Sequence, residues 1–372
     1  MEIFKYKKRK ILVISMQGIG DLLLITPALS LLRRNFPQSI ISVLVLSNAK
    51  DIILGNPDID RVIIYDHKKK SIFAILKFIL KLRKEGFNLS ICAYPSGLRA
   101  IFVGFLTGAP LRIGQNLVCV KKIPFLLTHK IDVIKVKHAV DMNIDLIKTL
   151  GQVSNDKKKQ LVMPINQTDT EFVLRYKRRH DISDTNIFIC IHPGVSKLGE
   201  SRRWPLDKFI KLSDRLVEEY NARIVFIGIE DDRAALNEIN GTMNKKQLVV
   251  VNWPIKRVSA LIKSCDLFIG NNSGPMHIAA AVKTTTIGLF GDTDPRIHGP
   301  YGENNIVVRK NLNCSPCFYP FLHGTLDCAR LDRCIGRGRP KCIKSEFECM
   351  KSIEVDDVLK EVKKIESVWK RT

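Results

Sequence analysis

Asp21 follows two glycines in the segment SMQGIGDLLLITPAL, at the point where an apolar run begins. Gly18 and Gly20 are expected to let the backbone turn tightly and approach a ligand closely. Two interpretations of Asp21 are open. Its carboxylate either caps the helix that follows, by accepting backbone N–H bonds, or acts as a general base on a bound substrate.

A second segment, IHPGVSKLGESRRWP, gathers hydrogen-bonding and cationic side chains. Ser196 offers a hydroxyl, and Lys197, Arg202 and Arg203 place three positive charges close together in the sequence. This composition predicts an anion-binding loop. The alternative is an ordinary basic surface loop, since the whole chain has a net charge of +23.

A third segment, FIGNNSGPMHIAAAV, has the pattern of a strand, a turn and a helix. Asn272, Ser273 and Gly274 are favoured cap residues, and Pro275 suits the first helical position. Amide groups at such a helix start can bind a phosphate. His277 falls in the first turn, so we expect it to contact the ligand, although a single histidine is more often structural.

Six of the ten cysteines lie between residues 314 and 349. The pair Cys314-x2-Cys317 is a plausible half of a structural zinc site, with Cys328 and Cys334 as possible further ligands. The alternative is a loop of reduced cysteines without metal. A metal here would be structural, because these cysteines lie outside the three segments described above.

These segments need a scaffold, and the chain predicts one in which strands alternate with helices. The predicted helices cover residues 21–35 and 71–85. The predicted strands are 10–15, 40–46, 61–65, 88–93, 186–191, 223–229, 247–251, 266–270 and 285–290. This alternation indicates two α/β domains with doubly wound parallel sheets, 1–175 and 176–372. In such sheets ligands bind beyond the carboxyl ends of the strands, and a pair of sheets is expected to form a cleft.

The composition agrees with two ordinary domains, since 372 residues with 45% hydrophobic content can form two cores. The net charge of +23 favours polyanionic partners: nucleic acid, anionic membranes or phosphorylated substrates. An aromatic content of 7%, without an interleaved binding motif, argues against nucleic acid. The N-terminal apolar run is too short for a signal peptide or a membrane span, so a cytoplasmic location is expected.

The order of these motifs resembles the family-9 glycosyltransferases, whose best-known members are ADP-heptose:lipopolysaccharide heptosyltransferases. The matching segments are ILVISMQGIGDLLLITPALSLLRRNFP, HPGVSKLGESRRWP, NNSGPMHIAAA, GLFGDTDPRIHGPYG, CSPC and CMKSI. The resemblance implies a GT-B fold of two Rossmann-like domains facing a central cleft. The first domain would bind the acceptor, and the second would bind the nucleotide sugar.

The resemblance also implies an inverting transfer that needs no divalent metal, with Asp21 as the general base. The leaving diphosphate would then be stabilised by amides at Ser273 and Gly274, together with Ser196 and nearby cations. Arg202 falls where the family commonly has a phosphate-contacting lysine.

Three further positions follow from the resemblance. His277 matches the histidine of the family motif Asp-Thr-Gly-Pro-Met-His, and either Asp232 or Glu230 matches a carboxylate near the nucleoside. Asn272 stands where the family has aspartate, and Ser273 where it has threonine. The lost negative charge leaves the sugar and nucleotide preference open.

The expected partners are a nucleotide-sugar donor, with ADP-heptose implied by the resemblance, and a lipopolysaccharide-type glycolipid at the inner membrane surface. The basic N-terminal KYKKRK either adds attraction to that surface, as in a peripheral protein, or is a solvated tail. No other cofactor is expected. Two alternatives remain, a nucleotide-sugar epimerase or hydrolase of the same fold and a basic nucleic-acid-binding protein.

Overall fold

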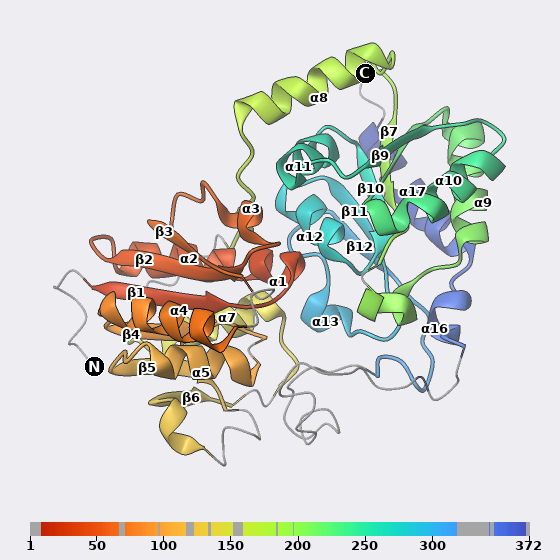
Figure 1. The fold of residues 1–372 in the computed structure, drawn as a ribbon. Helices are drawn as coiled ribbons and strands as arrows, with labels where there is room; N and C mark the ends of the chain where they lie inside the picture. Colours follow the sequence, from red (N-terminus) through yellow and green to blue (C-terminus); the bar gives the residue numbers. More distant parts are fainter. Residues whose placement is uncertain are drawn as a thin grey trace. The chain divides into compact units, whose positions relative to one another are not determined.

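The computed structural model describes residues 9–66, 71–95, 97–116, 123–132, 135–151, 159–183, 185–195, 197–317, 342 and 346–369. Contacts divide the chain into two compact units (Figure 1). The chain passes from the first unit to the second between Pro164 and Ile165, and its C-terminal helix belongs to the second. In the described residues no helix combines the length and the apolar character that spanning a membrane requires.

The first unit is built on a six-stranded parallel sheet of order β3-β2-β1-β4-β5-β6. Its strands are β1 (Lys10–Ser15), β2 (Ile40–Leu46), β3 (Arg61–Tyr65), β4 (Leu89–Cys92), β5 (Leu111–Gln115) and β6 (His129–Ile131). The central strands are almost continuously apolar because helices cover both faces of the sheet. Ile11 of β1 pairs with Ile41 on one side and with Leu89 on the other.

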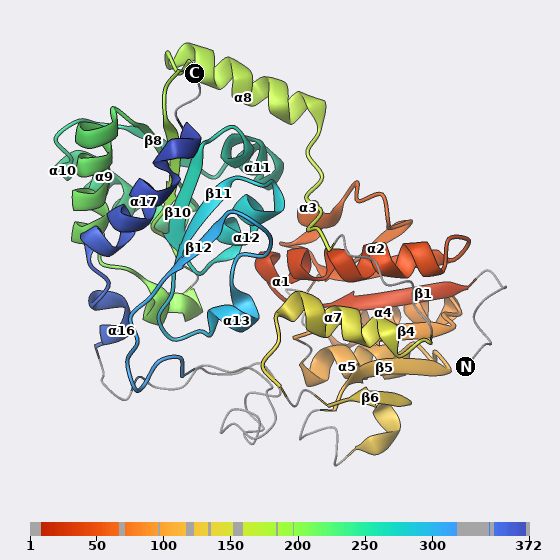
Figure 2. The same ribbon diagram turned by 180° about the vertical axis from the view of Figure 1, so that it is seen from behind.

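Helices cover the two faces of this sheet as separate groups. One face carries α1 (Ile19–Leu24), α2 (Thr26–Asn35), α3 (Lys50–Ile53) and α7 (Ala139–Lys148) (Figure 2). The other carries α4 (Ile72–Lys84) and α5 (Leu98–Leu106), and the short 3-10 helix η2 (Pro124–Leu126) contacts α5.

The predicted strands of this unit are confirmed, but the single helix predicted over 21–35 is wrong. The chain forms α1 and α2, which are separated at Ile25. Pro27 lies at the start of α2, and proline is tolerated only in the first turn because it has no N–H to donate. β5 and β6 were not predicted, since their sequences LRIGQ and HKI have few apolar residues.

The second unit has a parallel sheet of order β12-β11-β10-β7-β8-β9. Its strands are β7 (Phe188–His192), β8 (Arg223–Gly228), β9 (Leu248–Val251), β10 (Leu267–Asn271), β11 (Thr285–Leu289) and β12 (Asn305–Val308). Five of them lie within two residues of their predicted bounds, and β12 was not predicted. The expected fold class of two doubly wound parallel-sheet domains is therefore confirmed.

Eight α-helices and two 3-10 helices complete the described part of this unit. The α-helices are α8 (Gln167–Arg179), α9 (Leu206–Tyr220), α10 (Arg233–Thr242), α11 (Ile255–Lys263), α12 (Gly274–Ala281), α13 (Pro295–His298), α16 (Glu348–Lys351) and α17 (Val355–Trp369). The 3-10 helices are η3 (Lys197–Arg202) and η4 (Glu230–Asp232).

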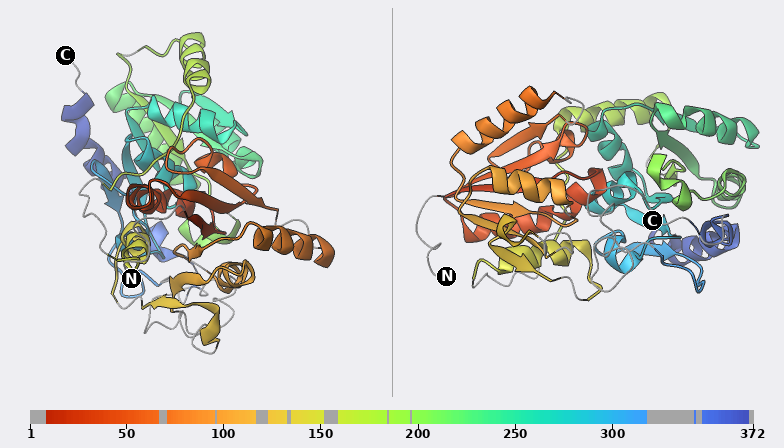
Figure 3. Two further views of the ribbon diagram at one scale, coloured as in Figure 1. Left: turned by 90° about the vertical axis from the view of Figure 1, so that its left-hand side faces the viewer. Right: turned by 60° about the horizontal axis from the view of Figure 1, so that its bottom comes forward.

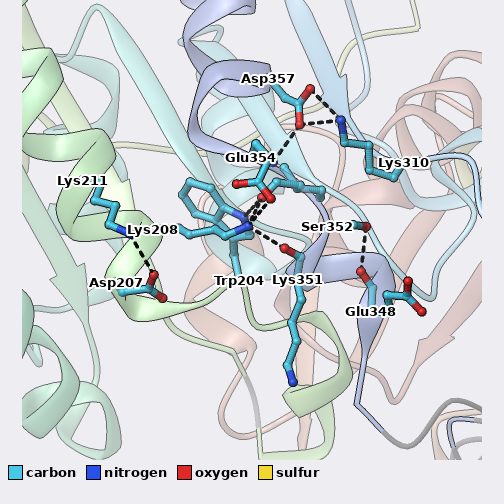
Figure 4. A network of polar contacts seen from close by, with 11 residues as sticks. Trp204, Asp207, Lys208, Lys211, Lys310, Glu348, Lys351, Ser352, Glu354 and Asp357 are labelled. Atoms are coloured by element: carbon cyan, nitrogen blue, oxygen red, sulfur yellow. Dashed lines mark hydrogen bonds and ion pairs between the residues drawn. The ribbon is translucent and has the colours of Figure 1, made fainter.

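The segment before α17 is held to the second unit by Trp204 and Lys208 (Figure 4). Trp204 is fully buried, packs edge-on against Phe209, and donates its indole N–H to the Ile353 carbonyl at 2.9 Å. Lys208 Nζ donates to the same carbonyl at 2.9 Å and to Glu354 Oε1 at 2.9 Å. The C-terminal segment is therefore part of the core that supports the loop after β7.

Candidate functional site

Each sheet has one place where the strand order reverses, and a candidate residue follows a strand at each of these places. In the first unit β1 lies between β2 and β4, and in the second β7 lies between β8 and β10. Ligands of doubly wound sheets bind beyond the carboxyl ends of the strands at this reversal. Asp21 follows β1, whereas Ser273 follows β10.

Asp21 lies in the first turn of α1 and is half-buried. The N-cap is Gly18, so Asp21 is not the N-cap residue of this helix. The helix already begins at Ile19, which places Gly20 inside the first turn instead of in a tight loop before it. A carboxylate in this position benefits from the positive end of the helix dipole.

Tyr94, which sequence reasoning missed, lies at the carboxyl end of β4 and near Asp21. Burial, and secondly the negative charge of Asp21, raise the pKa of the Tyr94 hydroxyl. The Tyr94 backbone is held by Asn143 of α7, which accepts from its N–H at 2.8 Å and donates to its carbonyl at 3.2 Å. Gln17 donates to the Pro95 carbonyl at 2.8 Å, so the loop before Asp21 is braced against the end of β4.

In the cationic loop predicted after β7, both arginines form ion pairs with carboxylates. Arg202 Nε lies 3.5 Å from Asp292 Oδ1, and Arg202 Nη1 donates to the Asn272 carbonyl at 3.3 Å. Arg203 forms a two-point contact with Glu200, which raises the pKa of Arg203 and lowers that of Glu200. Arg202 therefore bridges two strand-end loops. Ser196 lies outside the described residues.

The segment after β10 forms the predicted strand, turn and helix. Ser273 is the N-cap of α12, and a proline occupies its first turn, as expected. Asn271, for which the sequence predicts no role, donates to the Pro193 carbonyl at 2.8 Å and accepts the backbone N–H of Trp204 at 3.1 Å. Gly274 begins the helix, and His277 is buried in it with 5% exposure.

His192, at the end of β7, is a second residue that sequence reasoning missed. Its Nδ1 lies 3.1 Å from Ser273 Oγ, in hydrogen-bond contact. Burial is the main reason that the pKa of His192 is lowered to about 4. The negative charge of Asp232 acts in the opposite direction and raises this pKa, whereas the positive charge of Arg203 lowers it. A neutral imidazole at neutral pH therefore lies beside the N-cap of α12.

The structure separates the two carboxylates that were expected near a nucleoside. Asp232 is buried, accepts the Ile229 N–H at 3.0 Å, and lies against Gly194, where a Cβ would come within 2.6 Å of Asp232 Oδ1. Glu230 is exposed, and its carboxylate is bonded to Arg233 at 2.6 and 2.8 Å and to Asn252 at 2.8 Å. Only Asp232 of the two is close to His192 at the strand ends.

Asn272 takes part in a buried relay of hydrogen bonds. Its Nδ2 donates to Thr293 Oγ1 at 2.8 Å, and Thr293 Oγ1 donates to Asp292 Oδ1 at 3.0 Å. Asp292 Oδ2 accepts the Ser201 hydroxyl at 2.6 Å. The amide thus links the loop after β10 to the loop after β11.

Four of the clustered cysteines lie in the described residues, and Cys328 and Cys334 lie outside them. Burial, then the charge of Asp292, raise the pKa of Cys317 to about 11 and that of Cys349 to about 12. Cys314 and Cys342 lie near both of these thiols, and negative charge on either of them also raises the pKa of Cys317 and of Cys349. Among the described residues no group of three or more His, Cys, Asp or Glu side chains is arranged to hold a metal ion.

Comparisons with known proteins agree with this architecture. The family model "Glycosyltransferase family 9 (heptosyltransferase)" matches residues 75–320. Lipopolysaccharide heptosyltransferase 3 of Escherichia coli K12 is 29% identical over 307 residues, covering 77% of this chain and 84% of the relative.

Two solved structures have the same fold. The family-9 glycosyl transferase from Veillonella parvula aligns with a TM-score of 0.79 and 22% identity, covering 97% of this chain and 98% of that one. The E. coli ADP-heptose lipopolysaccharide heptosyltransferase II aligns with a TM-score of 0.71 and 20% identity, covering 96% and 98%.

Proposed function

This chain belongs to glycosyltransferase family 9, the heptosyltransferase family, and from that premise we propose that it transfers heptose from ADP-heptose to a lipopolysaccharide core or related glycolipid. It is therefore a glycosyltransferase, as the sequence motifs predicted. One observation carries the proposal: each of the two sheets has a candidate site at its own point of strand reversal. A transfer between two substrates needs a binding place for each of them.

We assign the acceptor to the first domain and Asp21 as its general base. In the proposed inverting reaction, Asp21 takes the proton from an acceptor hydroxyl while that oxygen attacks the anomeric carbon. The bond from this carbon to the diphosphate oxygen breaks, and ADP leaves with the electron pair. The position of Asp21 in the first turn of α1 supports this role, since the helix dipole favours its charged form.

We assign the nucleotide sugar to the second domain. The amides of Ser273 and Gly274 at the start of α12 would bind the diphosphate, with Ser196 and Arg202 contributing further donors. His277 would contact the donor, and Asp232, which is favoured over Glu230 by its place near His192, would lie near the nucleoside. The reaction is proposed to need no divalent metal.

The structural zinc site remains a separate proposal, with Cys314 and Cys317 as two ligands and Cys328 and Cys334 as the others. Metal analysis of protein purified without chelator tests it. Less than about 0.2 equivalents of zinc or iron would end it, because a structural site binds its metal tightly.

The proposed location is the cytoplasmic side of the inner membrane, with peripheral attachment. Donor choice is tested by thermal shift with ADP-, GDP-, UDP- and CMP-linked compounds, since a ligand that binds only the folded state raises stability. We expect ADP-heptose to give the largest shift, and turnover to require an acceptor. Equal shifts from all four nucleotides, or turnover without an acceptor, would contradict the proposal.

A further inference from the structure

Helix α4 exposes an unusual amount of apolar surface. Among the described residues twelve large apolar side chains are exposed, and five of them lie on this helix. The highest exposures are 84% for Phe73, 80% for Ile72, 54% for Leu76 and 50% for Leu80. In both panels of Figure 3 the helix (orange) runs along the edge of the first unit. A run of exposed apolar residues of this kind marks an interaction surface.

The exposed apolar residues of α4 are not the ones that pack this helix against the first unit. The inward face is formed by Phe78, Ile79 and Leu82, which pack against the core of the first unit. Phe73, Leu76 and Leu80 recur at spacings of three and four residues, which places them together on one side of a helix. We call these three residues the outer face of α4. Because α4 already has an inward face, the outer face is not needed for its packing.

Positive charge flanks the outer face. Lys77, Lys81 and Lys84 are exposed, and Ile72–Lys84 contains no acidic residue. Lysine side chains can lie along an apolar surface and place their ammonium groups at its rim. An apolar stripe with a lysine border is the pattern of a helix that lies in the plane of a membrane interface.

We propose that the outer face of α4 docks on an anionic lipid bilayer, with its apolar side chains entering the acyl boundary and its lysines contacting headgroup phosphates. A second copy of the chain fits less well. It would bring the same three lysines and the same net charge of +23 to the contact, whereas anionic lipid supplies the opposite charge.

This proposal deepens the peripheral location proposed above by naming the surface that meets lipid. The test therefore uses lipid alone, with no sugar donor, so that its outcome is separate from the outcome for sugar transfer. The full-length protein is sedimented with vesicles of phosphatidylethanolamine and phosphatidylglycerol, and with neutral phosphatidylcholine vesicles. We expect binding to the anionic vesicles that weakens as salt rises.

Two variants separate the apolar and charged contributions. Phe73→Ser/Leu76→Ser/Leu80→Ser should lower partition to anionic vesicles by about tenfold or more, since interfacial binding scales with buried apolar area. Lys77→Gln/Lys81→Gln/Lys84→Gln should lower it by a similar factor and remove most of the salt dependence.

Matched controls lie in the second unit. Leu174→Ser changes an apolar residue that is 44% exposed, and Lys245→Gln/Lys246→Gln/Lys263→Gln removes three exposed lysines. Both controls should keep partition within about twofold of the original. Melting curves of all variants show whether the fold is intact.

Equal loss in the controls and in the α4 variants would overturn the proposal, because it would indicate a general charge effect. Unchanged partition of a folded Phe73→Ser/Leu76→Ser/Leu80→Ser variant would overturn it as well. Sedimentation velocity decides between lipid and a second copy. A dimer that the same variant dissociates, without any change in lipid binding, would assign the outer face of α4 to self-association instead.

Discussion

The Asn272 side chain donates a hydrogen bond to Thr293 Oγ1 at 2.8 Å, and the Thr293 hydroxyl donates its single proton to Asp292. An amide can serve in this relay because it has a donor to offer. A carboxylate at position 272 has none, and Thr293 has one proton to share between two acceptors. Asn272, which stands where the family motif has aspartate, therefore has the hydrogen-bond donor that Thr293 and Asp292 require at this position.

Asn272→Asp should destabilise the second unit. The variant buries a second carboxylate near Asp292 and removes one buried hydrogen bond, so we expect a loss of about 2–4 kcal/mol in the free energy of unfolding at pH 7. Urea unfolding at pH 7 measures it. The exposed Asn313→Asp is the control and should change stability by less than about 0.5 kcal/mol. Equal stability of the two variants would mean that the relay contributes nothing.

Asp21→Asn should lower turnover by about 10²–10⁴-fold, the range for a positioned acid or base, while the affinity for ADP-heptose stays unchanged. Asp51 provides a matched control, since it also lies in the first turn of a helix that follows a strand of the same sheet. Steady-state kinetics of Asp51→Asn should be near normal. Near-normal turnover of Asp21→Asn would remove Asp21 from the mechanism.

Stability should fall in mild acid because of His192. The pKa of His192 is lowered to about 4, below the ordinary value of 6.5, so the unfolded chain binds this proton more readily than the folded one. The stability that depends on a neutral His192 is fully present above pH 6.5 and is lost as the pH falls toward 4. The total loss in the free energy of unfolding is about 3 kcal/mol. Urea unfolding of the original protein and of His192→Gln across this range tests the assignment. Parallel pH profiles for the two proteins would contradict it.

Gly194→Ala should disturb the second unit through Asp232. The added Cβ would meet the Asp232 carboxylate at 2.6–2.7 Å, and the displaced side chain should cost about 1–3 kcal/mol of stability and weaken donor binding. Gly241→Ala is the control, since a Cβ there meets nothing within 4 Å inside α10. We expect the control to be neutral or slightly stabilising. Melting temperatures and ADP-heptose titrations compare the two variants, and similar values for both would rule out the predicted clash.

Most of the strands followed from the sequence because their apolar runs are buried on both faces. The contacts of His192 did not, since its partner Ser273 is 81 residues away and only the pairing of β7 with β10 brings the two together. Asp232 and Glu230 are alike in sequence, and only their burial and their partners in the fold distinguish them. Each of these relationships depends on the order of strands in the sheet, which local patterns do not encode.

The bond from Trp204 to the Ile353 carbonyl has a consequence for synthesis on the ribosome. The first unit can complete its sheet while the rest of the chain is still being made, whereas the core around Trp204 stays open until Ile353 has emerged. Domains commonly fold in this order during synthesis. Chains arrested before Ile353 should have a protease-resistant first unit and a digestible second one, and resistance of both units in such chains would contradict this order.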